Sequence, residues 1–227
     1  MKRLFVSFAI AAAVLAACTT EIEGPFSEDI PQIIITATNV TPEATRTLVQ
    51  DGGTQVFWEV ADEIAVFYNR TGSRFVSQNT EPAASAEFSG SLSTVVGFNE
   101  GTATENPIWG LYPYREDASS DKVSVTTTLP AEQIGRAGSF AKNTQITLAR
   151  ANSLSLGFYN VTGGLRFSLT QEGIKKVTFE GANGETLAGT IKLAFADGVP
   201  VVQEVTDGKS LLTLSAPNGE TFQTGQW

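Results

Sequence analysis

The residue with the most distinctive chemistry is Cys18, the only cysteine in a chain of 227 residues. It follows two alanines at the end of an almost wholly apolar run, Leu4–Leu15, and two basic residues precede that run. A basic start, a short apolar stretch and small residues before a cut form the layout of a secretory signal peptide. The run is shorter than the roughly 20 apolar residues that span a membrane. We therefore predict that residues 1–17 are a signal peptide.

The segment Leu15-Ala16-Ala17-Cys18 resembles the lipobox of bacterial lipoproteins. In that class the thiol is acylated, with groups such as palmitate, and the chain is cut directly before the cysteine. The resemblance implies that Cys18 is the lipidated N-terminus of the mature protein; the alternative is an ordinary signal peptide with a chance cysteine. Two or more acyl chains give stable anchoring. We therefore expect an exported protein anchored to a membrane, with residues 18–31 as an acidic tether.

Arg46 is the second residue of interest, because its position in the sequence would be accessible to a protease. It follows a strand predicted at Gln32–Val40 and lies in a segment rich in proline and threonine. Proteolysis concentrates in exposed segments of this kind. A cut there would release the lipid and the first strand together. The alternative is a solvated loop arginine that nothing cuts, and four other arginines compete as sites: Arg70, Arg74, Arg115 and Arg136.

The composition argues against enzymatic, metal-binding and nucleic-acid-binding classes. The chain has no histidine, the commonest general base and metal ligand. Lipidation of Cys18 would leave no thiol for a nucleophile or a metal site. The formal net charge is −9, and binding to phosphates needs a basic surface. We predict no catalytic residues, no metal, no cofactor and no nucleic acid partner; two distant carboxylates forming a glycosidase pair are the weakest alternative.

Two carboxylate groupings have alternative interpretations. Asp62 and Glu63 are adjacent, so on a strand their side chains face opposite sides and form no catalytic pair. Asp117 and Asp121 flank a loop and would suit calcium, but no ligand spacing supports it, and solvated loop charge is the favoured interpretation. An aromatic set would suit a sugar platform, although core packing is favoured: Trp58, Trp109, Tyr112 and Tyr114.

The rest of the chain predicts an all-β protein. Short β-branched or alternating runs are separated by turn residues at spacings of roughly 8–12 residues, as in a β-sandwich. Ile33–Ile35 suggest burial on both faces of the first strand, and Asn183-Gly184 predicts a two-residue hairpin. Asp207-Gly208 predicts a turn between strands, and residues 131–143 predict a long loop. No apolar repeat at helical spacing persists over three turns.

The order of several segments resembles the fimbrillin family of Bacteroidales lipoproteins, the subunits of type V pili. The pieces that carry the resemblance, over most of the mature chain, are Thr45-Arg46-Thr47, Val56-Phe57-Trp58, Asp62-Glu63-Ile64-Ala65-Val66-Phe67, Glu87-Phe88-Ser89-Gly90, Leu111-Tyr112-Pro113-Tyr114, Thr128-Leu129-Pro130-Ala131-Glu132-Gln133, Phe158-Tyr159-Asn160-Val161-Thr162-Gly163-Gly164-Leu165-Arg166-Phe167 and Leu187-Ala188-Gly189.

The resemblance implies two transthyretin-like β-sandwich domains in tandem. We place the boundary near Ala151, which gives domains at residues 32–151 and 152–227. The second is short for such a sandwich, and Phe222 and Trp227 look like the opening of another strand. We therefore expect the second domain to be incomplete, either because the sequence is a fragment or because the gene is shortened. If the chain truly ends at Trp227, self-polymerisation is in doubt.

The resemblance also implies a function. The lipoprotein would be cut at Arg46 by an arginine-specific protease, and the vacated groove would accept a strand from another pilus subunit. The expected protein is a structural subunit of a fimbria at the outer membrane surface, with a role in adhesion to a host or bacterial ligand. The alternatives are a pilus anchor or tip subunit, or a lipid-anchored module that binds a glycan or host protein without polymerising.

Overall fold

The computed structural model describes residues 32–40, 57–68, 70–92 and 106–227. These residues form sixteen strands and a 3-10 turn, η2 (Pro217–Gly219), and no α-helix occurs among them. The prediction of an all-β protein is therefore confirmed.

Seven strands form a closed barrel in the order β1-β10-β9-β5-β2-β3-β4. The barrel closes at β1, which pairs antiparallel with β4 and parallel with β10. Closure leaves no free sheet edge among these strands. Their bounds are β1 (Ile33–Val40), β2 (Glu63–Phe67), β3 (Ser73–Ser77), β4 (Ser85–Gly90), β5 (Ile108–Tyr112), β9 (Thr147–Ala151) and β10 (Ser155–Asn160).

The barrel interior, here called the barrel core, receives side chains from all seven strands. Successive side chains on a strand point to opposite faces, so β2 sends Ile64 and Val66 inward. Trp58, which precedes β2, also lies in this core and is 2% exposed. The other members of the barrel core are Ile35, Ala37, Phe75, Ala86, Phe88, Leu92, Ile108, Ala149, Leu156 and Phe158.

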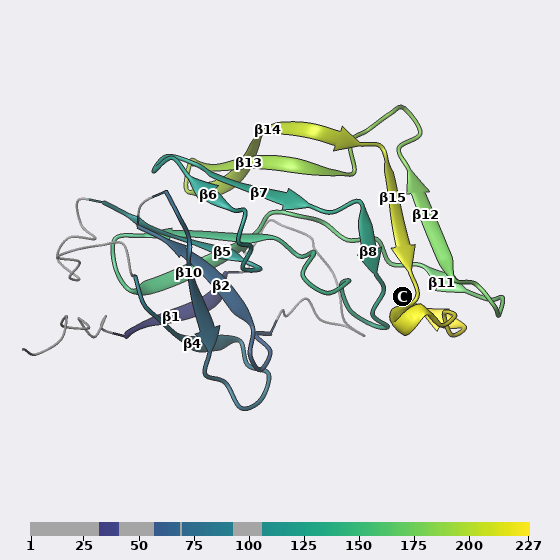
Figure 1. Ribbon diagram of the computed structural model, residues 1–227, viewed down its shortest axis with the longest axis horizontal. Helices are drawn as coiled ribbons and strands as arrows, with labels where there is room; N and C mark the ends of the chain where they lie inside the picture. The colour runs from purple at the N-terminus through teal and green to yellow at the C-terminus, as the bar shows by residue number, and fades with distance from the viewer. Residues whose placement is uncertain (1–31, 41–56, 69, 93–105) are drawn as a thin grey trace, which may run out of the picture.

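A four-stranded sheet, in the order β14-β13-β7-β6, packs on one side of the barrel (Figure 1). Its strands are β6 (Ser119–Ser120), β7 (Val125–Leu129), β13 (Ala188–Ala196) and β14 (Val199–Lys209). A second core fills the space between sheet and barrel, with Ala65, Phe67, Trp109, Leu111 and Leu148 from the barrel and Val125, Ile191 and Leu193 from the sheet. Strands β2 and β5 are therefore buried on both faces, which explains their continuous apolar sequences.

The remaining strands form two small sheets at the C-terminal end of the molecule (Figure 1). One has the order β12-β15-β8 and the other pairs β11 with β16. Their strands are β8 (Glu132–Ile134), β11 (Ser168–Leu169), β12 (Lys176–Glu180), β15 (Leu211–Ser215) and β16 (Gly225–Gln226). The C-terminal core between them has three buried residues, Leu214, Ala216 and Phe222, with partly buried neighbours around them.

The sheets include strands from both sides of the predicted boundary at Ala151. Strand β10 follows the boundary yet closes the barrel, and β7 precedes it yet pairs with β13. The division into domains 32–151 and 152–227 and their transthyretin-like build therefore stay predictions, while the all-β class is established by the strands themselves.

Several local predictions were wrong. Ile34 is 54% exposed, so β1 is buried on one face only. Asn183-Gly184 does not join a hairpin, because β12 pairs with β15 whereas β13 pairs with β14 and β7. The predicted turn at Asp207-Gly208 lies inside β14, where a register shift against β13 absorbs the extra residue. The predicted loop at residues 131–143 contains β8.

Candidate functional site

The two residues with predicted chemistry, Cys18 and Arg46, lie outside the described residues. Lipidation and cleavage therefore stay predictions. Strand β1 is the described element that lies between them in sequence, so a cut at Arg46 would detach β1 together with Cys18. The surroundings of β1 are therefore the candidate functional site. We call the space between β4 and β10 that β1 occupies the β1 slot.

Backbone pairing holds β1 on both sides of the slot. On one side, residues Ile33–Thr38 pair antiparallel with β4, with Thr36 opposite Glu87 and Ala37 opposite Ala86. On the other side, Thr36 begins the parallel register with β10, and its N–H donates to the Leu154 carbonyl at 3.0 Å. A strand paired on both sides gains main-chain hydrogen bonds whatever its side chains are.

Side chains of β1 fill the slot from alternate positions. Ile35 and Ala37 point into the barrel core and are 0% exposed. Ile35 lies opposite Phe88, whose ring packs edge-on against Trp58 at a centroid distance of 5.1 Å. The small Ala37 lies between Ala86 on β4 and Leu156 on β10. The slot thus has a large apolar position followed two residues later by a small one.

The outer face of β1 is largely exposed to solvent. Ile34 is 54% exposed, and Thr36 and Thr38 also face solvent. Val40 makes a close outer contact with β10, because a Cβ added to Gly157 would lie 2.8 Å from Val40 Cγ2. One face of β1 therefore carries most of the burial, and release of the strand would mainly expose the surroundings of Ile35 and Ala37.

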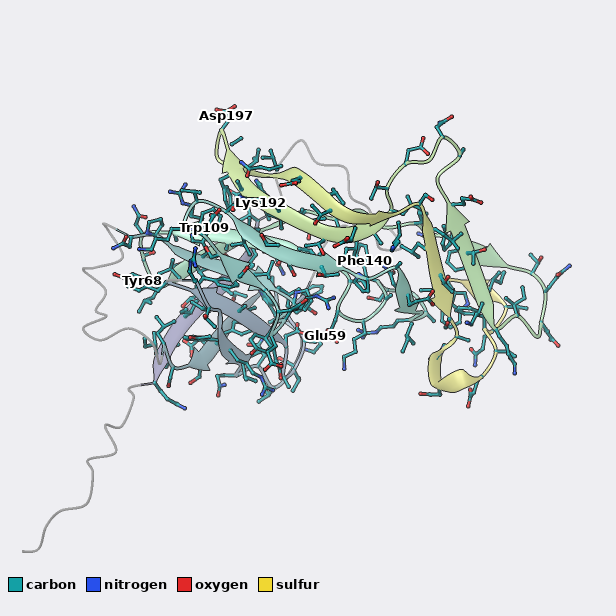
Figure 2. The ribbon with its side chains drawn as sticks, turned by 45° about the horizontal axis from the view of Figure 1, so that its top comes forward. Glu59, Tyr68, Trp109, Phe140, Lys192 and Asp197 are labelled. Carbon is teal, nitrogen blue, oxygen red and sulfur yellow. The ribbon has the colours of Figure 1, made fainter. Side chains whose placement is uncertain are left out.

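The four aromatic residues do not form a platform. Trp58 is 2% exposed in the barrel core and Trp109 is 1% exposed in the core beneath the four-stranded sheet. Tyr112 packs edge-on against Trp58, with 5.4 Å between the ring centroids. Arg150 lies over the ring of Trp109, 5.2 Å from its centroid. Trp109 itself is labelled in Figure 2. The two tryptophans thus serve separate cores, as the core-packing interpretation expects.

Asp62 and Glu63 have separate partners, in agreement with the expected opposite orientation. Asp62 Oδ2 accepts the Glu59 N–H at 2.7 Å, and its Oδ1 accepts the Tyr112 hydroxyl at 3.1 Å. Glu63 instead pairs with Arg74. Burial raises the pKa of Asp62 above its usual range, although these two hydrogen bonds oppose the effect. Sequence reasoning missed the Asp62–Tyr112 contact because fifty positions separate the two residues.

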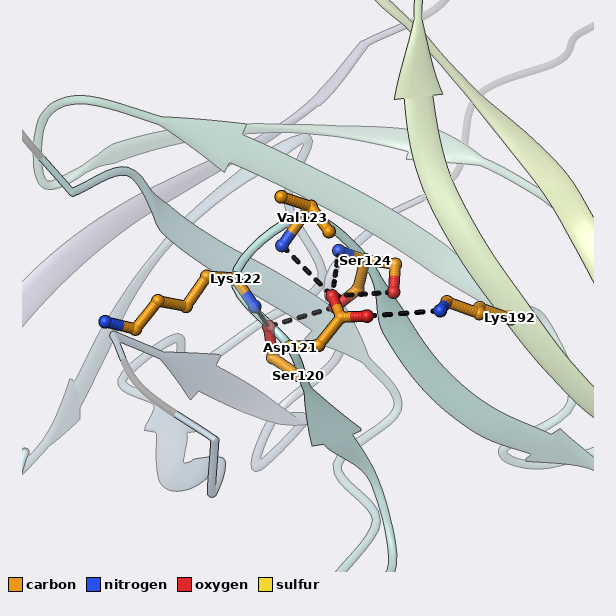
Figure 3. A network of polar contacts seen from close by, with 6 residues as sticks. All are labelled: Ser120, Asp121, Lys122, Val123, Ser124 and Lys192. Atoms are coloured by element: carbon orange, nitrogen blue, oxygen red, sulfur yellow. Dashed lines mark hydrogen bonds and ion pairs between the residues drawn. The ribbon is translucent and has the colours of Figure 1, made fainter.

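Asp121 organises the turn between β6 and β7. Its Oδ1 accepts the N–H groups of Val123 and Ser124 and the Ser124 hydroxyl, while Oδ2 pairs with Lys192 of β13 at 3.1 Å (Figure 3). Partial burial works against ionisation, but these hydrogen bonds lower the pKa of Asp121 to about 2. Both oxygens therefore have protein partners. Among the described residues, no group of three or more acidic side chains gathers as metal ligands would.

The other arginines that compete with Arg46 have structural partners. Arg74 lies in β3 and pairs with Glu63, and Arg136 Nη2 lies 2.6 Å from Glu59 Oε1. Arg115 Nη2 donates to the Asn143 carbonyl at 2.8 Å. Arg70 is exposed beside the barrel, and its carbonyl accepts the Ser120 N–H at 2.9 Å. Each of these four arginines therefore lies in a strand or makes a hydrogen bond or ion pair with another part of the protein.

No protein-family model matches the chain, and neither a curated protein nor a solved structure matches it. Within the described ranges, no helix has the length and hydropathy that crossing a membrane requires. The geometry of the β1 slot and the sequence before it are therefore the features from which a function can be inferred.

Proposed function

We propose that the chain is a structural subunit of a cell-surface fimbria, exported as a lipoprotein and assembled by protease-assisted donor-strand exchange, with a role in adhesion. One observation carries this proposal. The strand nearest the predicted lipid, β1, completes the barrel, and the predicted cut follows it in sequence. Cleavage would leave a barrel that lacks one strand.

The physical chemistry of an emptied slot supports assembly. Loss of β1 would leave β4 and β10 with unpaired N–H and carbonyl groups along facing edges. It would also expose the barrel core where Ile35 and Ala37 are now fully buried. Such an edge binds an extended strand by main-chain hydrogen bonds, and alternate side chains of that strand fill the pockets. Until cleavage, β1 would block the slot and prevent assembly.

The remaining parts of the proposal follow from the same mechanism. The partners would be other pilus subunits, and the acyl chains on Cys18 would hold the uncut precursor at the outer membrane surface. The fold would consist of two transthyretin-like units in tandem. We assign no catalytic residue and no cofactor to this function.

The test is intact mass and N-terminal sequencing of protein recovered from the cell surface, before and after treatment with an arginine-specific protease. We expect a new N-terminus at Thr47 and ladders of oligomers. Arg46→Lys is the matched control, because it keeps the charge but removes the arginine that the protease requires. It should remain monomeric and acylated.

An acylated Cys18 that persists after treatment, with monomers only, would contradict the stalk-subunit proposal. That result would leave a pilus anchor or tip subunit, or a lipid-anchored module that binds a surface ligand. Oligomers that form equally from Arg46→Lys would place the cut elsewhere, and the mass of the new N-terminus would identify the residue.

A further inference from the structure

Strand β1 is the element through which tension from the N-terminal side of the chain would enter the barrel. Its N-terminal end lies on the side of the barrel farthest from the C-terminal sheets (Figure 1). The chain that leaves β10 runs the other way, because the next strand in sequence, β11, belongs to those sheets. A lipid at Cys18, where the sequence predicts one, would therefore pull the barrel from one side, and a load on the C-terminal sheets would pull it from the other.

The parallel pairing of β1 with β10 decides how this tension acts. The register runs from Thr36 opposite Ser155 to Val40 opposite Tyr159, so the two strands point the same way. The tension pulls β1 by its N-terminal end and β10 by its C-terminal end, and these ends lie at opposite ends of the ladder. The two strands would therefore be drawn past each other along their length, and the hydrogen bonds between them would be loaded in shear.

A ladder loaded in shear resists force better than one that is pulled open from one end. If both forces acted at the same end, the bond from the Thr36 N–H to the Leu154 carbonyl would carry the load first, and the bonds would break one after another. In shear the bonds share the load and must lengthen together. Forced unfolding is governed by the unfolding rate, not by equilibrium stability. The direction of pulling should therefore change the rupture force of one and the same barrel.

Strand β4 adds a second ladder to the same load path. Residues Ile33–Thr38 pair with β4 along most of the length of β1. A β1 that slid along its own axis would break this ladder and the ladder with β10 at once. Because the barrel is closed, β1 also has no free edge from which it could peel away. Lengthwise removal of β1 therefore requires the loss of both ladders in one step.

The side chains of β1 oppose sliding as well. Successive side chains alternate between the faces, so the shortest slip that keeps the same face toward the core is two residues. Tension would then move Ala37 to the place of Ile35, which would leave a core where it is now 0% exposed. Asn39 would move to the apolar position between Ala86 and Leu156. Burial of a side-chain amide without a partner is unfavourable, so a slipped register gives no stable resting state.

We propose that β1 is a mechanical clamp: in the uncut protein it carries tension between the N-terminal anchor and the rest of the chain through two ladders loaded in shear. Its role in the cell rests on the lipid anchor of the proposed function, because an anchored chain is pulled at β1. The C-terminal sheets, with three buried residues, would extend first and leave the barrel folded. Tension alone would then leave β1 in place.

Single-molecule force measurements in an optical trap test the clamp by pulling one barrel in two directions. In the full-length chain with Cys18→Ser, two introduced cysteines attach the DNA handles. Gln32→Cys with Gly163→Cys pulls opposite ends of the β1–β10 ladder, whereas Gln32→Cys with Asn152→Cys pulls the same end. All three positions are exposed, so the substitutions leave both cores intact. At equal loading rate, the first pair should rupture at a severalfold higher force than the second.

A matched pair of core substitutions separates the clamp from general stability. Ile35→Ala removes a β1 side chain from the barrel core, and Leu193→Ala removes one that is also 0% exposed from the core beneath the four-stranded sheet. Both should lower the free energy of unfolding in urea, because each leaves a cavity. Only Ile35→Ala should clearly lower the rupture force between handles at Gln32 and Gly163, since Leu193 lies on β13, outside the stretch that the handles load.

The outcomes keep the clamp and the proposed function apart. Equal rupture forces in the two pulling directions, or an equal loss of force in the two core variants, overturn the clamp. Because the measurement uses no protease, either result leaves donor-strand exchange standing. A direction-dependent rupture force supports the clamp, even where protease treatment yields only acylated monomers and so contradicts the stalk-subunit proposal.

Discussion

The barrel encloses a core to which seven strands contribute, whereas the C-terminal sheets surround three buried residues, Leu214, Ala216 and Phe222. The barrel has no free edge, but the three-stranded C-terminal sheet has two, β12 and β8. Opening free energies within one protein range from near zero to the global value, and few buried contacts mark the low end. The comparison indicates that the C-terminal sheets open before the barrel does.

Truncation of one phenylalanine in each region should give the largest contrast. Phe88→Ala should lower the free energy of unfolding by about 3–5 kcal/mol, because it opens a cavity beside Trp58 in the closed core. Phe222→Ala should remove amide-exchange protection from β12 and β15 while barrel amides keep theirs. Urea denaturation and hydrogen exchange measure the two effects. Loss of barrel protection in Phe222→Ala would show that the regions unfold together.

Two glycines, one in each region, allow the tightness of packing in the barrel core and in the C-terminal core to be measured. A Cβ on Gly110 would lie 2.6 Å from Phe158 Cζ and 2.8 Å from Leu156 Cδ1 in the barrel core. A Cβ on Gly135 would lie 2.7 Å from Phe222 Cε1 in the C-terminal core. Gly110→Ala should lower the free energy of unfolding by about 1–3 kcal/mol, because the surrounding side chains of the barrel core have no room to move away from the added methyl group. Gly135→Ala should cost less in the same denaturation experiment, since the Phe222 ring borders a thinner core; equal costs would argue against looser packing there.

The acidity of Asp62 offers a pH test at the barrel. Its pKa is raised, mainly by burial, so the folded state binds the proton more tightly than the unfolded state does. The stabilising contribution is complete below the unfolded pKa of about 3.9 and is lost as the pH rises through the folded pKa. Asp62→Asn should abolish this loss and gain stability relative to the native chain as the pH rises.

The measurement is urea denaturation of both proteins from acid to neutral pH. In the Asp62→Asn variant, the amide oxygen would accept the Glu59 N–H and the amide nitrogen would donate toward the Tyr112 hydroxyl, so the contacts are kept. A difference between the two proteins that stays constant with pH would contradict the assignment of the buried charge to Asp62.

A smaller gain in stability than at Asp62 is expected from substitution of Ala61, which adopts a φ of 58° in the turn before β2. The left-handed region is strained for alanine and open to glycine. Ala61→Gly should raise the free energy of unfolding by up to about 1 kcal/mol. Ala182→Gly, at an exposed turn residue of the C-terminal region with ordinary φ, should lower it by up to about 1 kcal/mol through unfolded-chain entropy. Thermal unfolding of both variants provides the comparison.

The smallest effect is expected for an ion pair that joins the turn before β2 to the loop after β8. Arg136 Nη2 lies 2.6 Å from Glu59 Oε1, with the two side chains 50% and 45% exposed. An exposed pair of this kind contributes about 0.2–1 kcal/mol and is screened by salt. A double-mutant cycle with Glu59→Gln and Arg136→Gln should give a coupling in this range at low salt and close to none at about 1 M salt. A coupling that survives high salt would mean that the two regions are joined more firmly than their separate cores suggest.

Strand positions follow from sequence where β-branched or aromatic residues alternate or run together. Ile33–Val40 and Glu63–Phe67 are examples, and the residue types alone predict both. Strand β9 was not predicted, because its last three residues, Ala149-Arg150-Ala151, have low β-propensity. It forms nonetheless, because β5 and β10 pair with it on either side.

Pairing partners were much less predictable than strand positions. Asn183-Gly184 has the local chemistry of a hairpin, yet the strands on either side belong to different sheets. The turn propensity of these two residues stabilises a hairpin only weakly. Packing of Val177 and Phe179 beside Leu214 in the C-terminal core decides the pairing instead. The β1 slot was unpredictable for the same reason, since its walls come from Phe88 and Leu156, far apart in sequence.

The pairing of β1 with β10 also has a consequence for how the chain folds as it emerges. Thr36 pairs with Ser155, far later in the chain, whereas β2 pairs with β3, and β3 with β4, across short loops. Contacts with large sequence separation form slowly because a long loop must close first. As the chain folds, β1 would therefore complete the barrel only after β10 has been made. The barrel would pass through an open stage, in which β10 has not yet paired with β1, and a chaperone that shields the free edges of the open barrel would act during that interval.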